Sequence, residues 1–590
     1  MSTANKKMSA HRHFSFFAIP MWIGVLTFAG SFQSSDAQTP AVELPRVTSV
    51  TQVTHDGFSK TSLLSDDSFL YVTEWQAGHR VISKVPVEGV GQSTLPSTFS
   101  NLQGLDLSPD RTRILISGVN GSSSDELWAL PLVAGTPERI GSLAGHDASW
   151  SADSREVVFA QGNTLFQASS IGTQSHELFT ASGSVFAPHF SPDGQRIRFS
   201  VSDPAHNTTS LWEIGRNSSN PHALLTSWQN GSVACCGSWT ADGRYYIFQI
   251  TQTATTALTT LWALPESSRS TDQAATPIQL TAGPTSFGNA WLSRDSKKLW
   301  TIGVAPAGEI VKYVPDTKNF VPVLSGVSAT DLNFSPDGKW VTYVSIPDGT
   351  LWRSRADGAK KLQLTFAPER AALPHWSPDG KQIAYVRIQP GKPWKISVIP
   401  AAGGNPKEIL PENRSQVDAS WSADGTRIMF GYFLHDPNGL DIRVVDVKTH
   451  KSVTVPGSDG LFSPRWSPNG RYVAALSPDF TTVKLFDFET QKWSDWLTEP
   501  AGSVSYPVWS ADSNYLYFDD LVTDEEWIRR IKVGENHPER IFAVDGIERY
   551  SGPLGLWSGQ TADGSWMFVR DSSTQEIYQL GIELPRQEGK

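Results

Sequence analysis

The chain has almost no cysteine. Its 590 residues include only two, the neighbours Cys235 and Cys236. This count excludes a disulfide framework as the support of the fold, and it leaves no lipid-modifiable cysteine directly after the leader described below. A hydrophobic core must therefore supply the stability.

The chain also lacks an excess of basic charge and a recognisable nucleophile motif. It has 49 Lys and Arg against 59 Asp and Glu, which gives a net charge of -10. Nucleic-acid binding requires a basic face, so we exclude nucleic acid as a partner. The pattern G-x-S-x-G, which places the nucleophile of many hydrolases, does not occur.

Only one apolar run is long, at residues 14–30. Three basic residues precede it and small residues at 35 and 37 follow, which is the order of a secretory signal. We therefore predict a signal peptide over 1–37 and a periplasmic or secreted protein. The alternative is an uncleaved membrane anchor, because 17 apolar residues are at the short end of a bilayer span.

The sequence does contain a repeat. The stretch "HWSPDGKQIAYV" at 375–386 has eleven relatives, and we call the acidic or amide residue of each phrase its anchor. The anchors are Asp67, Asp110, Asp153, Asp193, Asp242, Asp295, Asp337, Asp379, Asp424, Asn469, Asp512 and Asp563. Their separations run from 40 to 53 residues and average 496/11, or 45. This period is typical of a four-stranded propeller blade.

Each part of the phrase has a physical role. In residues 377–380, proline presets φ for a type I turn, aspartate bonds nearby backbone groups, and glycine supplies the positive φ that closes a hairpin. The alternating stretch after the turn predicts a strand, and the aromatic residue before it predicts a wedge between neighbouring sheets. Since the anchors occur once per blade, we interpret them as turn formers and predict no metal.

Two further stretches per repeat predict a third and a fourth strand, so the fold class is all-β with about twelve four-stranded blades. Twelve blades exceed the usual number around one axis, and two six-bladed rings are the simplest division. We predict a first propeller over 38–327 and a second over 328–590. A division into seven and five blades is an alternative, as is closure of the last blade by the N-terminal strand at Arg46.

The repeated "WSPDGKxIAY" phrase resembles the WD40-like repeats of TolB-type β-propellers, of the tandem propellers of tricorn protease, of dipeptidyl peptidases and of some bacterial winged-helix regulators. The resemblance covers nearly all of the chain after the leader, and eight of the twelve anchors fit the pattern closely. It implies a propeller scaffold. We expect neither the α/β domain of TolB, nor a hydrolase domain, nor a DNA-binding domain.

The residues just before the anchors are expected near the ring axis. Several are polar, and histidines and carboxylates from different blades can converge on a ligand there. The candidates for ligand binding at a funnel mouth are His146, Asp147, His189, Asn333, His375, Asp418 and Arg465. The alternative is that one polar residue per blade only hydrates the channel or bonds backbone.

Cys235 and Cys236 form the most unusual local feature. Their Cα atoms are separated by one peptide, about 3.8 Å, which is shorter than the usual disulfide span. A vicinal disulfide that stiffens a loop near a pocket is one interpretation. Two buried thiols that act as small apolar side chains are the other.

These observations favour an exported, non-catalytic scaffold that binds a protein, peptide or glycan partner in the cell envelope without a cofactor. The first alternative is a propeller enzyme of hydrolase, lactonase or lyase type, with His189 and His375 as bases or ligands at the axis. The second is a sensory ectodomain on an uncleaved membrane anchor.

Overall fold

The computed structural model describes residues 44–585 except for fourteen short gaps, at 77–78, 90, 97–98, 100, 120–125, 134–135, 204–207, 227, 229–232, 252–257, 267–275, 435, 500–503 and 521–525. The predicted signal peptide, 1–37, lies outside the described residues. All regular elements of the described part are β-strands. None of its segments forms a helix long and apolar enough to cross a membrane.

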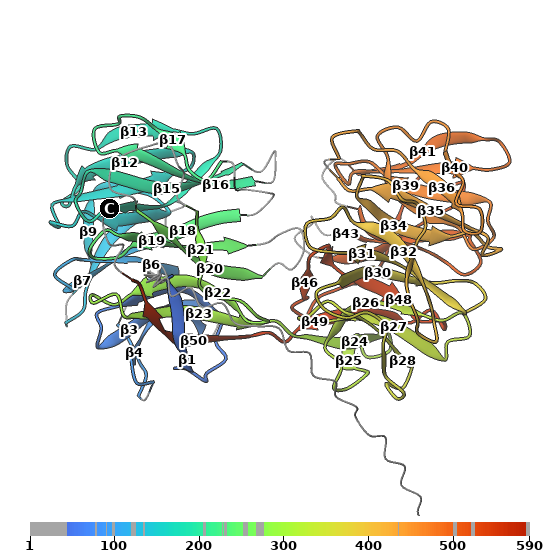
Figure 1. Ribbon diagram of the computed structural model, residues 1–590, viewed down its shortest axis with the longest axis horizontal. Helices are drawn as coiled ribbons and strands as arrows, with labels where there is room; N and C mark the ends of the chain where they lie inside the picture. The colour runs from blue at the N-terminus through green and yellow to red at the C-terminus, as the bar shows by residue number, and fades with distance from the viewer. Residues whose placement is uncertain are drawn as a thin grey trace, which may run out of the picture. The chain divides into compact units, whose positions relative to one another are not determined.

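The strands form twelve four-stranded antiparallel sheets and one small hairpin, which confirms the predicted fold class. Ten sheets are continuous in sequence. They span residues 60–94, 101–144, 147–180, 184–223 and 233–279 in the first ring, and 329–363, 370–408, 416–454, 462–498 and 504–543 in the second ring (Figure 1).

In each of these ten sheets the first strand is the innermost, and β22 and β48 hold that place in the sixth sheet of each ring. The inner strands of the first ring are β2 (Lys60–Ser65), β6 (Asn101–Leu107), β10 (Asp147–Trp150), β14 (Ser184–Phe190), β18 (Val233–Trp239) and β22 (Ser286–Leu292). Those of the second ring are β26 (Ala329–Phe334), β30 (Arg370–Trp376), β34 (Gln416–Trp421), β38 (Phe462–Trp466), β42 (Val504–Trp509) and β48 (Ser558–Gln560). Strand β22 contacts both β18 and β2, and β48 contacts both β42 and β26, so each ring closes after six blades.

The sixth sheet of each ring is built from distant parts of the chain. In the first ring, β22 and β23 (Lys298–Ala305) are completed by the C-terminal strand β50 (Thr574–Glu583) and by β1 (Arg46–Gln52). In Figure 1 the red strand β50 accordingly lies beside the blue strand β1. The sequence-based alternative has the strand at Arg46 closing the last blade. Strand β1 does pair with the C-terminal strand, but the sheet that they complete is the sixth of the first ring.

The second ring uses the same device. Its sixth sheet combines β48 and β49 (Trp566–Asp571) with β24 (Gly308–Val314) and β25 (Asn319–Pro322). Ala305 pairs with Thr574 in one ring, and Gly308 pairs with Asp571 in the other. The second ring is therefore inserted between two neighbouring strands of the first.

Strand pairing crosses the predicted domain boundary twice. A cut near residue 327 separates β24 and β25 from β49 and β48, and it separates β50 from β23. The sequence-based ranges 38–327 and 328–590 treat each ring as one continuous segment. The pairing instead follows 308–571 for the second ring, with 46–305 and 574–583 for the first.

A buried lysine fixes the closure of the first ring. The Lys60 side chain is fully buried, and its Nζ forms an ion pair with Asp56 and lies 4.0 Å from Glu74 Oε2 and 3.9 Å from Glu576 Oε2. It also donates a hydrogen bond to the carbonyl of Gln575. Because Gln575 and Glu576 belong to β50, this charge cluster joins the C-terminal strand to the first blade.

The aromatic wedges lie where the sequence predicts them. Trp376, Trp421, Trp466 and Trp509 are each more than 90% buried. Each packs in a cluster that combines its own sheet with the preceding one. A single small sheet cannot bury its faces alone, and these aromatic side chains bury a large apolar surface between neighbouring sheets.

The anchor turn is a local hydrogen-bonded unit. Ser422 Oγ donates to Asp424 Oδ1 (2.6 Å) and accepts a bond from the Arg427 amide (3.0 Å), while the Thr426 amide donates to the same carboxylate oxygen (3.0 Å). These bonds lower the pKa of Asp424 to about 2, the Ser422 bond contributing most. The same serine or threonine bond recurs at the other anchors from Asp110 onward.

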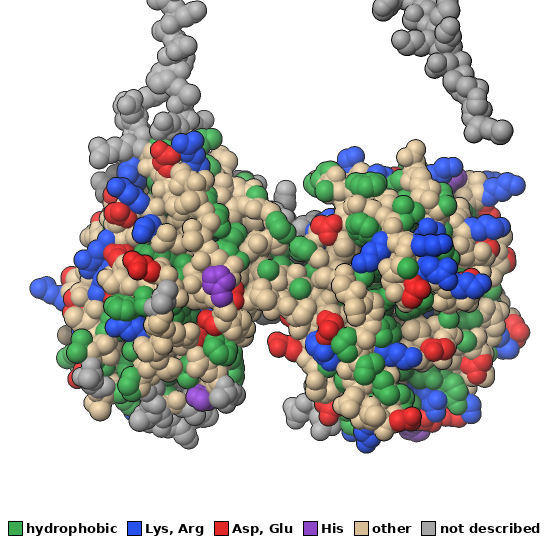
Figure 2. All heavy atoms as spheres, turned by 90° about the horizontal axis from the view of Figure 1, so that it is seen from below, with side chains coloured by type: hydrophobic (Ala, Val, Ile, Leu, Met, Phe, Trp, Pro, Cys, Tyr) green, Lys and Arg blue, Asp and Glu red, His purple; other side chains and the backbone are tan. Residues whose placement is uncertain are grey.

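Acidic and basic side chains occur together over the face shown in Figure 2.

We predict that the fragment 306–573 folds alone, because all strands of the second ring lie within it. Conversely, removal of residues 572–590 should unfold the first ring, since it deletes the buried Ile577 and Leu580 of β50. Circular dichroism of the fragment and amide exchange of the truncated chain test this. Protection that survives in the first ring after truncation would contradict it.

We predict that Ser422→Ala lowers the free energy of unfolding by about 1–2 kcal/mol at pH 7, because a buried hydroxyl with two hydrogen bonds is lost. Ser422→Thr is the matched control, since Thr240 and Thr561 fill the same position elsewhere. The pKa of Asp424 is lower in the folded protein, about 2, than in the unfolded chain, near 4. Ionised Asp424 therefore stabilises the fold above about pH 4, and this contribution disappears as the pH falls through 2. In urea titrations, the difference in the free energy of unfolding between Ser422→Ala and the unaltered protein should be smaller at pH 2 than at pH 7.

Candidate functional site

The residue six positions before the anchor is the bulge of the inner strand. Eight of these residues have left-handed backbone without being glycine: Ala187, Cys236, Asn289, Asp331, Leu373, Asp418, Ser463 and Tyr506, with φ between 45° and 58°. The strand register shifts at each of them. This conformation costs an L-residue about 1–2 kcal/mol, so the surrounding structure must hold it.

Hydrogen bonds between blades hold the bulges. The Leu373 amide donates to Asp331 Oδ2 (3.1 Å), and the Asn289 amide donates to Gln249 Oε1 (2.8 Å). In both cases the acceptor belongs to the preceding blade. A side chain of one blade thus satisfies the strained amide of the next.

The residue four positions before the anchor often has a structural role. Asn333 Oδ1 accepts a bond from the Trp376 amide (2.9 Å), and Asp106 Oδ2 accepts one from the Trp150 amide (2.8 Å). Both bonds cross from one inner strand to the next. Asn333 thus bonds the backbone of the next blade, as in the alternative to ligand binding.

Three of the predicted site residues lie in the first ring. His146 Nδ1 is 2.9 Å from the carboxylate of Asp147, and both side chains are about one-third exposed. His189 belongs to the next blade, where burial lowers its pKa to about 4 against the opposing charge of Asp147. His189 and Asp106 border a cavity of about 290 Å³ at the anchor end of the inner strands.

The other four, His375, Asp418, Arg465 and the Asn333 described above, lie in the second ring. Arg465 Nη2 donates to Asp418 Oδ1 at 2.9 Å, in an ion pair that is mostly buried. Burial lowers the pKa of His375 to about 4, and the neighbouring Arg465 lowers it further while Asp418 opposes the shift. The seven predicted residues thus form two groups, one in each ring.

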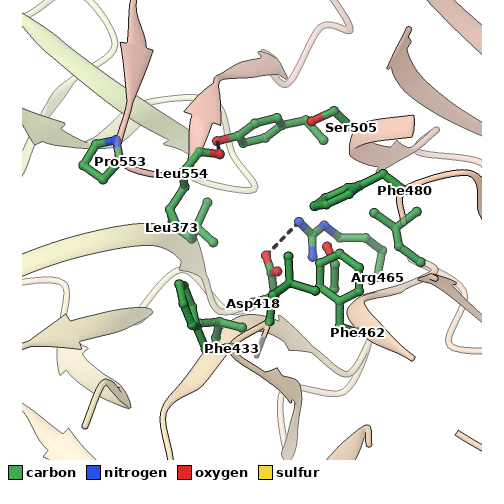
Figure 3. A pocket seen from close by; sticks show the side chains of 14 residues that line it. Leu373, Asp418, Phe433, Phe462, Arg465, Phe480, Ser505, Pro553 and Leu554 are labelled. Carbon is green, nitrogen blue, oxygen red and sulfur yellow. Dashed lines mark hydrogen bonds and ion pairs between the residues drawn. The ribbon is translucent and has the colours of Figure 1, made fainter. Parts of the chain in front are cut away.

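The second ring has a largely apolar cavity of about 260 Å³ at the starting ends of its inner strands, which we call the axial chamber (Figure 3). Four aromatic side chains line it, from Phe433, Phe462, Phe480 and Tyr506. Aliphatic walls come from Leu373, Val417, Leu434, Leu476, Pro553 and Leu554, and polar groups from Asp418, Ser463, Arg465 and Ser505. Figure 3 shows the Asp418–Arg465 pair among the phenylalanine rings.

A second cavity of about 220 Å³ lies toward the anchor ends of the same strands. Leu373, Arg465 and Tyr506 border both cavities, so they stand between them along the axis. Asp331 borders this second cavity, and burial raises its pKa to about 6. The hydrogen bond from the Leu373 amide and a contact with Thr330 oppose that rise.

A short hairpin borders the axial chamber. Strands β46 (Ser551–Gly552) and β47 (Gly555–Leu556) precede the last inner strand, and their turn places Pro553 and Leu554 in the chamber wall. Tyr506 Oη donates to the Leu554 carbonyl (3.0 Å), and Arg549 Nη2 donates to the Leu556 carbonyl (3.1 Å). These bonds fix the hairpin to the ring.

Cys235 and Cys236 are joined in a vicinal disulfide within β18. Among the residues that the structure describes, no group of three or more histidine, cysteine or acidic side chains is placed to hold a metal ion.

Sequence reasoning missed most of the chamber. Tyr506, Ser463 and Leu373 of the chamber, and Asp331 of the second cavity, share the six-residue offset from their anchors with Asp418, and this offset is the signal that could have found them. The walls from Phe433 and Phe480 come from loops between the second and third strands of their blades, which vary from repeat to repeat.

The fold and its axial cavities define a tandem six-bladed β-propeller. No protein-family model matches the chain, and no curated protein matches it. Similar solved structures are a putative TolB from Agrobacterium tumefaciens (19% identity, TM-score 0.38, 45% of this chain and 98% of that one) and TolB from Acinetobacter baumannii (14%, 0.32, 50% and 81%). Tricorn protease is a third (13%, 0.32, 80% and 49%).

We predict that Arg465→Met lowers the free energy of unfolding of the second ring by about 3–5 kcal/mol, because it leaves the buried Asp418 without its counter-charge. The double variant Asp418→Asn/Arg465→Met should recover most of the loss. Arg530→Met, which breaks the exposed pair with Glu539, is the control and should change little. Urea unfolding of all three measures this, and an equal loss in the double variant would contradict the explanation.

Proposed function

We propose that the protein is an exported, non-catalytic double propeller and that its second ring binds a protein or peptide partner by taking an apolar side chain into the axial chamber. The observation that carries this proposal is the chamber itself, with four aromatic rings around a buried ion pair.

The lining of the chamber favours a peptide over a glycan. Apolar walls with a few fixed polar groups are typical of sites that hold an apolar anchor side chain and orient what is attached to it. Arg465 and Asp418 add a donor and an acceptor to the lining, which suits the polar backbone next to such a side chain. A sugar would leave many hydroxyl groups against phenylalanine without partners.

Export is supported by the order of residues 1–37, basic, apolar and then small. An envelope or extracellular location follows from it, with a membrane-anchored form as the alternative. Sequencing of the mature N-terminus distinguishes them, since cleavage near Gln38 supports release.

We predict that Phe480→Ala weakens peptide binding by about tenfold or more, because it removes a wall of the chamber. The probe is a random heptapeptide library displayed on phage and selected on the purified protein, followed by calorimetry of the selected peptides. We expect the selected peptides to share an aromatic or aliphatic anchor residue.

Phe488→Ala is the matched control. Phe488 lies in the same blade and is half-buried like Phe480, but it packs on Trp466 outside the chamber. Equal losses in both variants would contradict a chamber site. Turnover of ester, lactone or glycan substrates that disappears in Asp331→Asn or His375→Gln would replace the scaffold by the enzyme alternative.

A further inference from the structure

The vicinal disulfide lies at the axis of the first ring. Cys236 is the bulge residue of β18, with φ of 56°, and it holds the same repeat position as Asp418 and Tyr506 in the second ring. Side chains at that position line the axial cavities of the second ring. The disulfide therefore belongs to the axial rim of the first ring, where the sequence alone placed it only near a loop.

Hydrogen bonds connect the disulfide to both neighbouring blades. The Cys236 amide donates to Ser200 Oγ of the preceding blade (3.4 Å). Gln249 Nε2 donates to Cys235 Sγ (3.4 Å), while Gln249 Oε1 accepts the bond from the Asn289 amide of the following blade. One glutamine thus joins a disulfide sulfur to the strained bulge of the next inner strand.

The hydrogen bond between Gln249 and Cys235 depends on whether the sulfur is in a disulfide or a thiol. A disulfide sulfur only accepts hydrogen bonds, whereas a thiol also donates, so reduction changes what Gln249 faces. Reduction also removes the covalent bond that holds the two side chains together at the bulge. Both effects reach Asn289 through Gln249.

The pair is open to external reagents and has no internal exchange partner. Cys236 is half-buried rather than enclosed, and the chain contains no third cysteine. Any thiol that reacts with this disulfide must come from another molecule.

We propose that Cys235–Cys236 is a thiol–disulfide exchange site for an external dithiol, and that its reduction loosens the axial rim of the first ring through Gln249 and Asn289. A thiolate of the dithiol attacks the Cys236 sulfur, and the electron pair of the broken bond leaves on Cys235, which takes a proton. The second thiolate then attacks the mixed disulfide and releases Cys236, which takes the second proton. The dithiol is oxidised to a disulfide, and two electrons and two protons reach the protein.

The test uses the intact protein with dithiothreitol as the dithiol and iodoacetamide as the label. Without reductant we expect no adduct, and after native-state reduction we expect two. Amide exchange at Asn289 should then accelerate about fivefold, the factor for one lost hydrogen bond, and should return on reoxidation. The bulge amide of Leu373, in the second ring, should not change.

Two variants separate the steps. Cys235→Ala/Cys236→Ala should show no adduct and no response to dithiothreitol. In Gln249→Ala, two adducts should still form, but reduction should no longer alter Asn289. Adducts before reduction, or resistance of the folded protein to dithiothreitol, would overturn the exchange site. Two adducts without any change at Asn289 in the unaltered protein would overturn the coupling.

Discussion

The pairing of β50 with β23 and β1 is the constraint on which the whole molecule depends. It completes the sixth sheet of the first ring with both ends of the chain, and Lys60 seals the junction inside a cluster of carboxylates. Because β23 and β50 are neighbours, the chain can leave the first ring, build a complete second ring and return. A second propeller is thereby added without opening the first.

In each blade, the residues that support the sheet differ from the residue at the bulge of the inner strand. The anchor turn and the aromatic wedge keep the sheets in place, through bonds such as that of Ser422 to Asp424 and through burial of residues such as Trp421. Bulge side chains of the second ring line the axial cavities, while amides such as those of Leu373 and Asn289 are held by the blade before them. The side chain at this position is therefore free to differ from blade to blade, and the six versions of the phrase in one ring can build a specific cavity.

The two rings use the same positions for different chemistry. The bulge positions of the second ring include Leu373, Asp418 and Tyr506, which help to form an apolar chamber over an ion pair. Those of the first ring include Asn289 and the disulfide residue Cys236, in a polar setting with glutamine and serine partners. We therefore assign partner binding to the second ring and thiol exchange to the first, as separate proposals.

The sequence by itself determined the blade, because the turn "SPDG", the alternating strand and the wedge are local and recur at a fixed period. It also predicted the inner-strand position of Asp418 and Arg465. Only the tertiary structure decided that residues 308–322 join the second ring and that β50 returns to the first, since β-pairing between distant strands leaves no local signal. The chamber likewise depends on loops of several blades meeting at one axis, which spacing along a single blade cannot encode.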